Sequence, residues 1–291
     1  EFAKHYGFNN FESTLPIGSN KNDVGTYWEL KNYLTESLIS KNMYETQTLS
    51  FVSDESNKIF TPEKTSVEIN NPIDQTNKYL RTNLYISLID TYIFNLEQNN
   101  ISKMFFEINN VFDMGNHFKY DQIPNQVHTL SGIIPTEVST NDRRNTSTVN
   151  DIYYVKQLLV DVLGNYSIQQ IEKPGFHRNI SYLIIKDDIV LGHFGQLSIE
   201  LQDNYDLDKP VYLFSLDLTN VEKNQLISVD YKPLSPYPFI KFDLSFIVEP
   251  SFSAQELIYE VEDILSDNEN YLTIFDDLHN EKTRNLGIRI T

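Results

Sequence analysis

Apolar side chains recur every three or four positions in three stretches of the chain, a spacing that predicts amphipathic helices. We expect these helices at residues 23–41, 80–95 and 152–162, with Gly164 ending the last of them. The apolar positions that define them are Tyr27, Leu30, Leu34 and Leu38; Leu80, Leu84, Leu88 and Tyr92; and Ile152, Val155, Leu159 and Val162. An apolar stripe of this kind faces a core by default.

Strands are predicted where apolar and polar residues alternate, or where a short apolar run is bounded by turn residues. The expected strands cover residues 44–52, 105–112, 127–134, 182–185, 189–194 and 211–218. Asp187 and Asp188 form the turn of a hairpin between two of them, and residues 136–150 are polar enough to form a loop. Because the strands come mostly as sequential antiparallel runs, the pattern favours an α+β domain up to about Asp230.

Residues 231–291 follow a different pattern. Prolines at 233, 236 and 238 predict an extended lead-in, after which residues 242–248 alternate as a half-buried strand. Ser253 and Glu256 have the spacing of a capping box, which begins a helix. This helix runs through Leu257, Val261, Ile264 and Leu265. Strands near 271–275 and 286–290 complete a βαββ order.

Composition indicates a globular chain without thiol chemistry. Of the 291 residues, 40% are hydrophobic, with 18 Tyr and 18 Phe, unlike a disordered chain. The lack of cysteine excludes disulfides, thiolate metal sites and cysteine nucleophiles, and fits a cytoplasmic protein. No apolar run approaches the roughly 18 residues of a membrane span, and no signal peptide is present. We expect no membrane partner.

The net charge of −18 argues against a broad nucleic-acid-binding face. Residues 231–291 carry five Lys and Arg residues against eleven Asp and Glu residues. Any contact of this region with RNA should therefore be weak and local, and no DNA partner is expected.

Motifs for independent chemistry are missing: there is no Walker loop, no Gly-x-Ser-x-Gly elbow and no His-Glu-x-x-His. The acidic run at Asp203, Asp206 and Asp208 lacks the glycine and closing glutamate of a calcium loop, which favours a solvated turn. Four histidines do not have the spacing of metal ligands, which favours surface or hydrogen-bonded core positions for them: His117, His128, His177 and His193. A hydrolase using Asp276 and Asp277 is disfavoured, because adjacent acids on a strand point to opposite faces.

The order of residues in several segments resembles one protein family. Tyr231-x-x-Leu-Ser-x-x-Pro and then Asp243-Leu-Ser-Phe resemble the opening of the ferredoxin-like, anticodon-binding domain that ends the β subunit of bacterial phenylalanyl-tRNA synthetases. Further segments that resemble this family, in the same order, are Glu1 to Phe8, Ser13 to Pro16, Asn71-Pro72, Leu80-Arg81-Thr82-Asn83-Leu84, Phe106-Glu107-Ile108 with Val111-Phe112, Gly192 to Leu197, and Leu216-Asp217-Leu218. Each motif is weak singly, but their agreement along the chain is strong.

The resemblance implies three parts. Residues 1–22 would be the end of an upstream domain and a linker, and residues 23–230 a non-catalytic class II synthetase-like domain with an antiparallel sheet and flanking helices. Residues 231–291 would be the ferredoxin-like domain, truncated to βαββ. The chain starts at Glu1 without Met and stops within a strand pattern, so we expect a piece of a longer protein.

The resemblance also implies a function. In this family the β subunit scaffolds the α subunit, which activates phenylalanine, and helps to position tRNA-Phe in a heterotetramer of two α and two β subunits. ATP and Mg²⁺ then belong to the whole holoenzyme. Residues 105–108 contain no arginine to hold ATP, and the chain has no Gly-x-Gly pair. We expect this chain alone to be inactive and to need no cofactor, and the family's editing pocket would precede residue 1.

The resemblance nominates candidate residues for three roles. Glu1 matches the last of the acids that hold a Mg²⁺ shared with the α subunit, but its companions would precede it, which favours an ordinary helix glutamate. Leu30, Leu34 and Leu38 lie on a helix that resembles the class II subunit-packing motif, and form either an interface or core. The RNA-binding candidates are Lys232, Lys241, Lys282, Arg284 and Arg289.

An alternative function stays open: a stand-alone paralogue that kept the fold and acts as a protein-interaction module without a role in tRNA charging. The family often has His-Pro-Gly-Arg before its late hairpin, whereas residues 174–178 (Pro-Gly-Phe-His-Arg) have these residue types in a different order. This departure and the acidic segment after 231 favour the alternative slightly. The abrupt ends of the chain favour the β-subunit hypothesis.

Overall fold

The computed structural model describes most of the chain, in two compact units, Glu1–Ser228 and Val229–Thr291. The described residues are 1–12, 26–100, 103–115, 123–139, 147–221, 240–265, 271–280 and 283–291. The prolines at 233, 236 and 238 lie outside the described residues.

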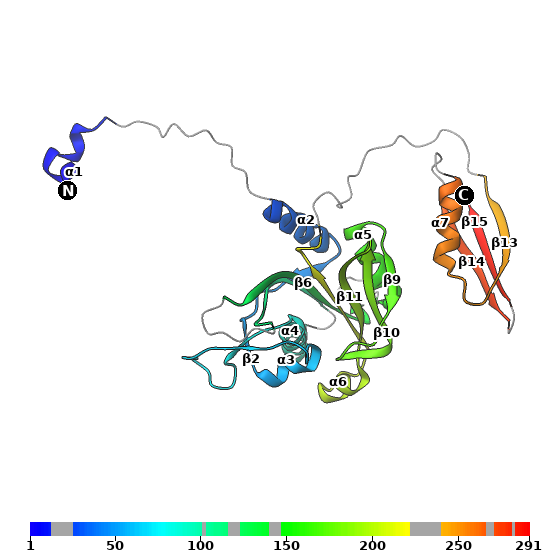
Figure 1. Ribbon diagram of the computed structural model, residues 1–291, viewed down its shortest axis with the longest axis horizontal. Helices are drawn as coiled ribbons and strands as arrows, with labels where there is room; N and C mark the ends of the chain where they lie inside the picture. Colours follow the sequence, from blue (N-terminus) through cyan, green and yellow to red (C-terminus); the bar gives the residue numbers. More distant parts are fainter. Residues whose placement is uncertain are drawn as a thin grey trace. The chain divides into compact units, whose positions relative to one another are not determined.

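The first unit contains both helices and runs of consecutive strands (Figure 1). Its helices are α1 (Phe2–Tyr6), the 3₁₀ turn η1 (Phe8–Asn10), α2 (Thr26–Ser40), α3 (Asp54–Phe60), α4 (Tyr85–Glu97), α5 (Ile152–Leu163) and α6 (Ile199–Asn204). Its strands are β1 (Met43–Glu45), β2 (Phe51–Val52), β3 (Val67–Glu68), β4 (Tyr79–Leu80), β5 (Met104–Asp113), β6 (Asn125–Pro135), β7 (Glu137–Ser139), β8 (Ser147–Val149), β9 (Ser167–Gln170), β10 (Phe176–Lys186), β11 (Ile189–Leu197) and β12 (Val211–Asp217). Within the described ranges, no helix is both long enough and apolar enough to cross a membrane.

A seven-stranded sheet forms the centre of the first unit, as far as it is described, in the order β1-β5-β6-β12-β11-β10-β9. All its pairs are antiparallel except β1 with β5, so the predicted α+β class with an antiparallel-rich sheet is confirmed. The predicted hairpin joins β10 to β11 at Asp187 and Asp188, whose φ angles of 50° and 61° are those of a tight hairpin turn.

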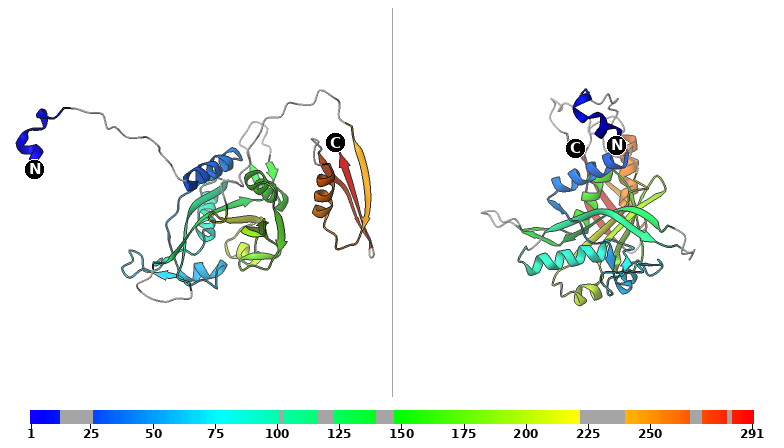
Figure 2. Two further views of the ribbon diagram at one scale, coloured as in Figure 1. Left: turned by 45° about the horizontal axis from the view of Figure 1, so that its top comes forward. Right: turned by 90° about the vertical axis from the view of Figure 1, so that its left-hand side faces the viewer.

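Helices cover both faces of this sheet (Figure 2). Successive strand residues point to opposite faces, so Phe106 and Phe214 join α2 and α5 in one core, while Phe105 and Leu213 join α3 and α4 in the other. The candidate site lies on the second of these two faces, next to α3 and α4.

The predicted strand over residues 44–52 is wrong as a single element. The backbone N–H of Thr46 still donates to Phe106 O at 2.8 Å, but that of Thr48 donates to the Glu107 side chain at 3.2 Å. The chain then leaves the main sheet, and β2 pairs with β4 instead. A side-chain acceptor has replaced the strand partner at this point, which the alternation of residues cannot indicate.

Two further expectations need correction. The helix expected from Leu80 begins at Tyr85, because Leu80 pairs with both β2 and β3 and Asn83 Oδ1 accepts the N–H of Tyr85 at 3.0 Å. The loop expected over residues 136–150 contains the antiparallel pair β7 and β8. The helix expected at 152–162 is confirmed as α5, which ends at Gly164 with φ 78°, a conformation suited to glycine.

The second unit has the predicted βαββ order (Figure 1). Its elements are β13 (Phe242–Val248), α7 (Ala254–Ile264), β14 (Leu272–His279) and β15 (Arg284–Ile290), and β15 lies between the other two strands. Ser253 caps α7 by accepting the N–H of Gln255 at 3.2 Å. Leu257 and Val261 of the helix pack on Leu286 and Ile288 of the sheet.

Candidate functional site

A cavity of about 190 Å³ lies against the sheet near the start of α4. Residues from α3 to α4, from β5, β6, β11 and β12, and from the segment before β10 line it. They are Thr61, Glu63, Lys64, Thr82, Asn83, Tyr85, Val111, Val127, Thr129, Lys173, Gly192, His193, Ser215 and Asp217. The mixture of cations, hydroxyls and apolar groups makes this cavity the candidate site.

A buried ion pair stands beside the cavity and joins two of the motifs found in the sequence. Arg81 Nη1 lies 3.1 Å from Glu107 Oε1, and both side chains have zero exposure. Glu107 also accepts from Thr48 Oγ1 at 2.7 Å and from Asn109 Nδ2 at 3.0 Å. Arg81 Nε donates to Asn110 O at 3.2 Å. The arginine of Leu80–Leu84 is thus held inside the fold by the glutamate of Phe106–Ile108.

The floor of the cavity holds a neutral imidazole. Tyr85 Oη lies 2.5 Å from His193 Nε2, and burial raises the pKa of the phenol well above its usual range. Burial also holds the pKa of His193 well below its usual range, and the positive charges of Lys173 and Lys64 lower it further. His193 is therefore an uncharged member of the site at neutral pH.

Two lysines from separate segments reach the same cavity. Lys64, after α3, donates to Thr82 O at 3.3 Å, and Lys173 precedes β10. Burial lowers the pKa of Lys173, the carboxylate of Glu63 raises it, and the charge of Lys64 lowers it. The two positively charged side chains therefore lie near each other in a partly desolvated environment.

The Gly192-to-Leu197 motif serves packing between strands. A Cβ on Gly195 would lie 2.5 Å from Ile180 O of the neighbouring β10, so only glycine allows this close approach. Phe194 and Leu197 are buried in the two cores. Gly192 and His193 are the members of the motif that line the cavity.

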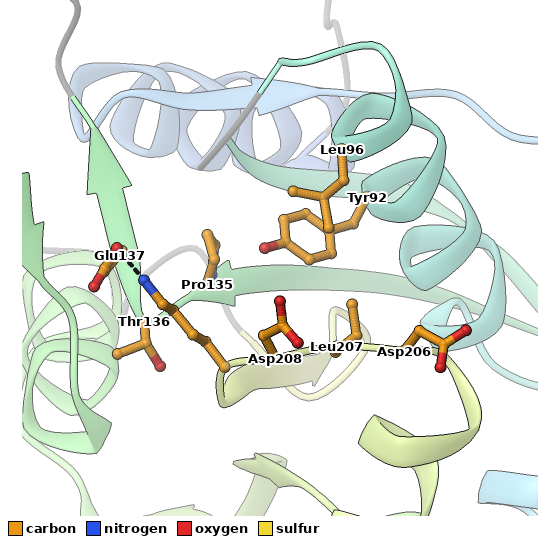
Figure 3. A pocket seen from close by; sticks show the side chains of 9 residues that line it. Tyr92, Leu96, Pro135, Thr136, Glu137, Asp206, Leu207 and Asp208 are labelled. Carbon is orange, nitrogen blue, oxygen red and sulfur yellow. Dashed lines mark ion pairs between the residues drawn. The ribbon is translucent and has the colours of Figure 1, made fainter.

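A second cavity of about 210 Å³ lies between the end of α4 and the segment after α6 (Figure 3). Lys209 pairs with Glu137 across it at 2.5 Å. Figure 3 shows Asp206 and Asp208 on either side of Leu207 rather than converging on one point. Among the described residues no cluster of three metal-ligating side chains occurs. The acidic run is a turn in which Asp206 has φ 51°.

Two of the RNA-binding candidates of the second unit, Arg284 and Arg289, are engaged by carboxylates. Arg284 forms two hydrogen bonds with Asp277, at 2.8 and 2.7 Å, and Arg289 two with Asp243, at 2.7 and 2.8 Å. The guanidinium groups hold the pKa of both carboxyl groups below their usual range. Lys241 is exposed. Lys232 and Lys282 lie outside the described residues.

The three leucines proposed for an interface lie in the chain's own core, with exposures of 4% for Leu30, 0% for Leu34 and 1% for Leu38. They contact the sheet cluster, so their side chains are not available to a second subunit. Glu1 is exposed at the start of α1, where its carbonyl accepts the N–H of Lys4 at 3.0 Å, and its side chain forms no cap. The metal role of Glu1 stays a prediction.

The amino-acid sequence matches the model of a known protein family. The model of the phenylalanyl tRNA synthetase beta chain CLM domain matches residues 11–218, which is well over half of the chain. The chain belongs to this family, as its motifs predicted.

The curated relatives agree with this family. The phenylalanine–tRNA ligase beta subunit of Carboxydothermus hydrogenoformans is 25% identical over 97% of this chain and 36% of its own length. That of Clostridium acetobutylicum is 28% identical over 88% of this chain and 32% of its own length. The chain thus spans about a third of the length of the relatives it matches.

Solved structures overlap with the chain more loosely. A pyrrolysyl-tRNA synthetase from Desulfitobacterium hafniense has a TM-score of 0.47 at 12% identity, covering 67% of each chain. A Giardia lamblia prolyl-tRNA synthetase has a TM-score of 0.49 at 8% identity, covering 67% of this chain and 45% of its own. The family assignment does not depend on these overlaps.

Sequence reasoning missed Lys64 and Lys173 and treated His193 only as a histidine without ligand spacing. No local pattern connects these three residues, because they lie far apart in the chain: Lys64 follows α3, Lys173 lies between β9 and β10, and His193 lies on β11. The motif that contains His193 was the available indication, since its two glycines flank that position.

Proposed function

We propose that the chain is part of a phenylalanine–tRNA ligase β subunit that scaffolds the α subunit and helps to position tRNA-Phe, without activating phenylalanine itself. The buried position of the Arg81 side chain is the main support for this proposal. Its neighbours Thr82 and Asn83 line the cavity, but its own guanidinium is wholly buried against Glu107. A guanidinium in that state offers no bidentate contact to the phosphates of ATP.

The cavity itself does not fit ATP. Its volume of about 190 Å³ is below the roughly 300–1,000 Å³ of pockets that hold drug-sized ligands. No arginine is among its described lining residues. We therefore assign ATP, Mg²⁺ and the activation chemistry to the α subunit of a heterotetramer of two α and two β subunits, with Glu1 at most one member of a metal site.

Assembly with the α subunit would use the exposed face of α2, since the opposite face is buried. Trp28 and Ile39 are eleven residues apart, which is about three helical turns, so they share one face. Each is 53% exposed. Large apolar groups in such a position are what a protein interface buries.

The test is association with the α subunit, measured by light scattering after mixing, and amino-acid-dependent ATP–pyrophosphate exchange. The chain alone should show no exchange, and the mixture should form a stable complex that does. Ile39→Lys should weaken association roughly tenfold or more, because it replaces a buried apolar contact with a charge. Phe94→Lys on α4 is the matched control, since Phe94 is 61% exposed on another surface.

Each failure has a distinct meaning. Exchange by the chain alone would overturn the non-catalytic role. A folded chain that does not bind the α subunit would favour the stand-alone interaction module. Equal effects of Ile39→Lys and Phe94→Lys would place the interface away from α2.

For tRNA we propose weak, local contact by the second unit. The two carboxylate pairs of Arg284 and Arg289 support this, because each already neutralises the cation that a phosphate would need.

A further inference from the structure

We propose that the cavity beside α4 binds a small oxyanion, a carboxylate or a phosphate, between the ammonium groups of Lys64 and Lys173. This site is separate from the α-subunit interface and from amino-acid activation. The proposal concerns the first unit alone.

The first observation is the convergence of two cations. Lys64 and Lys173 come from segments more than a hundred residues apart, yet both line the cavity and both charges act on His193. Each lysine is half-buried rather than extended into solvent. Two ammonium groups repel each other in such a place unless an anion lies between them.

The second observation is the shortage of internal partners. Lys64 donates to the carbonyl of Thr82 at 3.3 Å, a long bond to a neutral group. Over the described part of the chain, no ion pair or hydrogen bond joins the Lys173 side chain to another residue, although the carboxylate of Glu63 acts on it at longer range. The other acid of the lining, Asp217, is turned into its own loop, where Oδ1 accepts from the Thr219 N–H at 2.9 Å and from its hydroxyl at 2.6 Å.

The third observation is the polarity of the remaining lining. Thr129 and Ser215 carry hydroxyls on the sheet floor, and α4 begins at Tyr85 beside the cavity. The amino end of a helix carries partial positive charge, so it favours an anion.

The size of the cavity limits the occupant. At about 190 Å³ it holds a small molecule and not a nucleotide. Val111 and Val127 give part of the lining an apolar surface, so a compact carbon body can accompany the oxyanion.

The experiment titrates the chain with inorganic phosphate and, separately, with acetate. Binding is followed by calorimetry and by the imidazole NMR signals of the histidines. We expect millimolar or tighter binding of at least one probe. The His193 signals should shift with the same dissociation constant while those of His279, in the second unit, stay in place. Phosphate binding without acetate binding would indicate a phosphorylated ligand, and the reverse a carboxylic acid.

Variants separate the site from general charge effects. Lys64→Met and Lys173→Met should each weaken binding roughly tenfold or more, because each removes a charged hydrogen bond. Lys173→Arg should keep most of it. Lys4→Met, which makes the same change of charge at an exposed position of α1, should change binding less than twofold. Far-UV circular dichroism of each variant checks that the fold is kept.

Two results would overturn the proposal. One is a folded wild-type chain that binds neither probe at concentrations well above about 1 mM. The other is binding that Lys173→Met and Lys4→Met weaken equally, since that would be the general attraction of a cationic surface.

Discussion

The buried pair of Arg81 and Glu107 allows a quantitative test, through the substitution Glu107→Gln. Glutamine keeps the shape of the side chain but removes the negative charge, and its amide nitrogen replaces an acceptor oxygen. Arg81 would then stay charged and uncompensated at zero exposure. Removing one partner of a buried ion pair costs about 3–5 kcal/mol, so we expect a loss of this size in the free energy of unfolding.

The same substitution at an exposed pair is the control. Arg178 Nε lies 2.8 Å from Glu172 Oε1, with side-chain exposures of 80% and 72%. Glu172→Gln should cost less than about 1 kcal/mol, because solvent screens an exposed pair. The two variants make the same chemical change at a buried carboxylate with several donors and at an exposed one that pairs with Arg178.

The assay is urea unfolding followed by the fluorescence of Trp28, the single tryptophan of the chain, which lies in the first unit. For a unit of this size a loss of 3–5 kcal/mol corresponds to a drop in Tm of about 6–20 °C. Arg81→Met, combined with Glu107→Gln, should cost less than the sum of the two single changes by about 1–3 kcal/mol. A loss under about 1 kcal/mol for Glu107→Gln, or strict additivity, would refute the role assigned to this pair.

Three further predictions concern other parts of the chain. Because the folded state lowers the pKa of His193, the unfolded chain takes up a proton first as pH falls below about 6.5. The free energy of unfolding should therefore decrease by up to about 1.4 kcal/mol per pH unit below that value, and His193→Gln should flatten this slope in urea titrations; an unchanged slope would contradict it. Gly132→Ala should destabilise by about 1–3 kcal/mol in thermal unfolding, since its Cβ would lie 2.2 Å from the Phe214 ring, and a neutral result would show that the ring can move. Asp243→Asn should free Arg289 and tighten tRNA binding in fluorescence anisotropy, with a salt slope steeper by about one; no change would remove Arg289 from the candidate contacts.

Much of the fold follows from local patterns. Leu30, Leu34 and Leu38 repeat at helical spacing and are buried as a helix stripe should be. Asp187 and Asp188 adopt the positive φ angles that a short turn between two apolar runs predicts. In both places the information lies within a few residues of the structure that it determines.

The predictions that were wrong or missing concern contacts between residues far apart in the chain. Thr48 continues an alternating pattern, but the chain leaves the sheet there because its N–H and hydroxyl bind a carboxylate 59 positions away. Arg81 and Glu107 were both present in recognised motifs, yet nothing in either motif indicates that they pair. The cavity lysines are further apart still. Contacts of this range are decided by topology, which periodicity does not encode.

The position of β12 in the sheet has a consequence for synthesis. This strand, Val211–Asp217, is the last of its sheet along the described chain, yet it lies between β6 and β11. Until it has left the ribosome, β1-β5-β6 and β11-β10-β9 are two separate ribbons, each with a long unpaired edge. Open edges of this kind attract other strands. A nascent chain that stalls before Val211 should be an aggregation-prone client of chaperones, whereas one that has passed Asp217 can close its sheet.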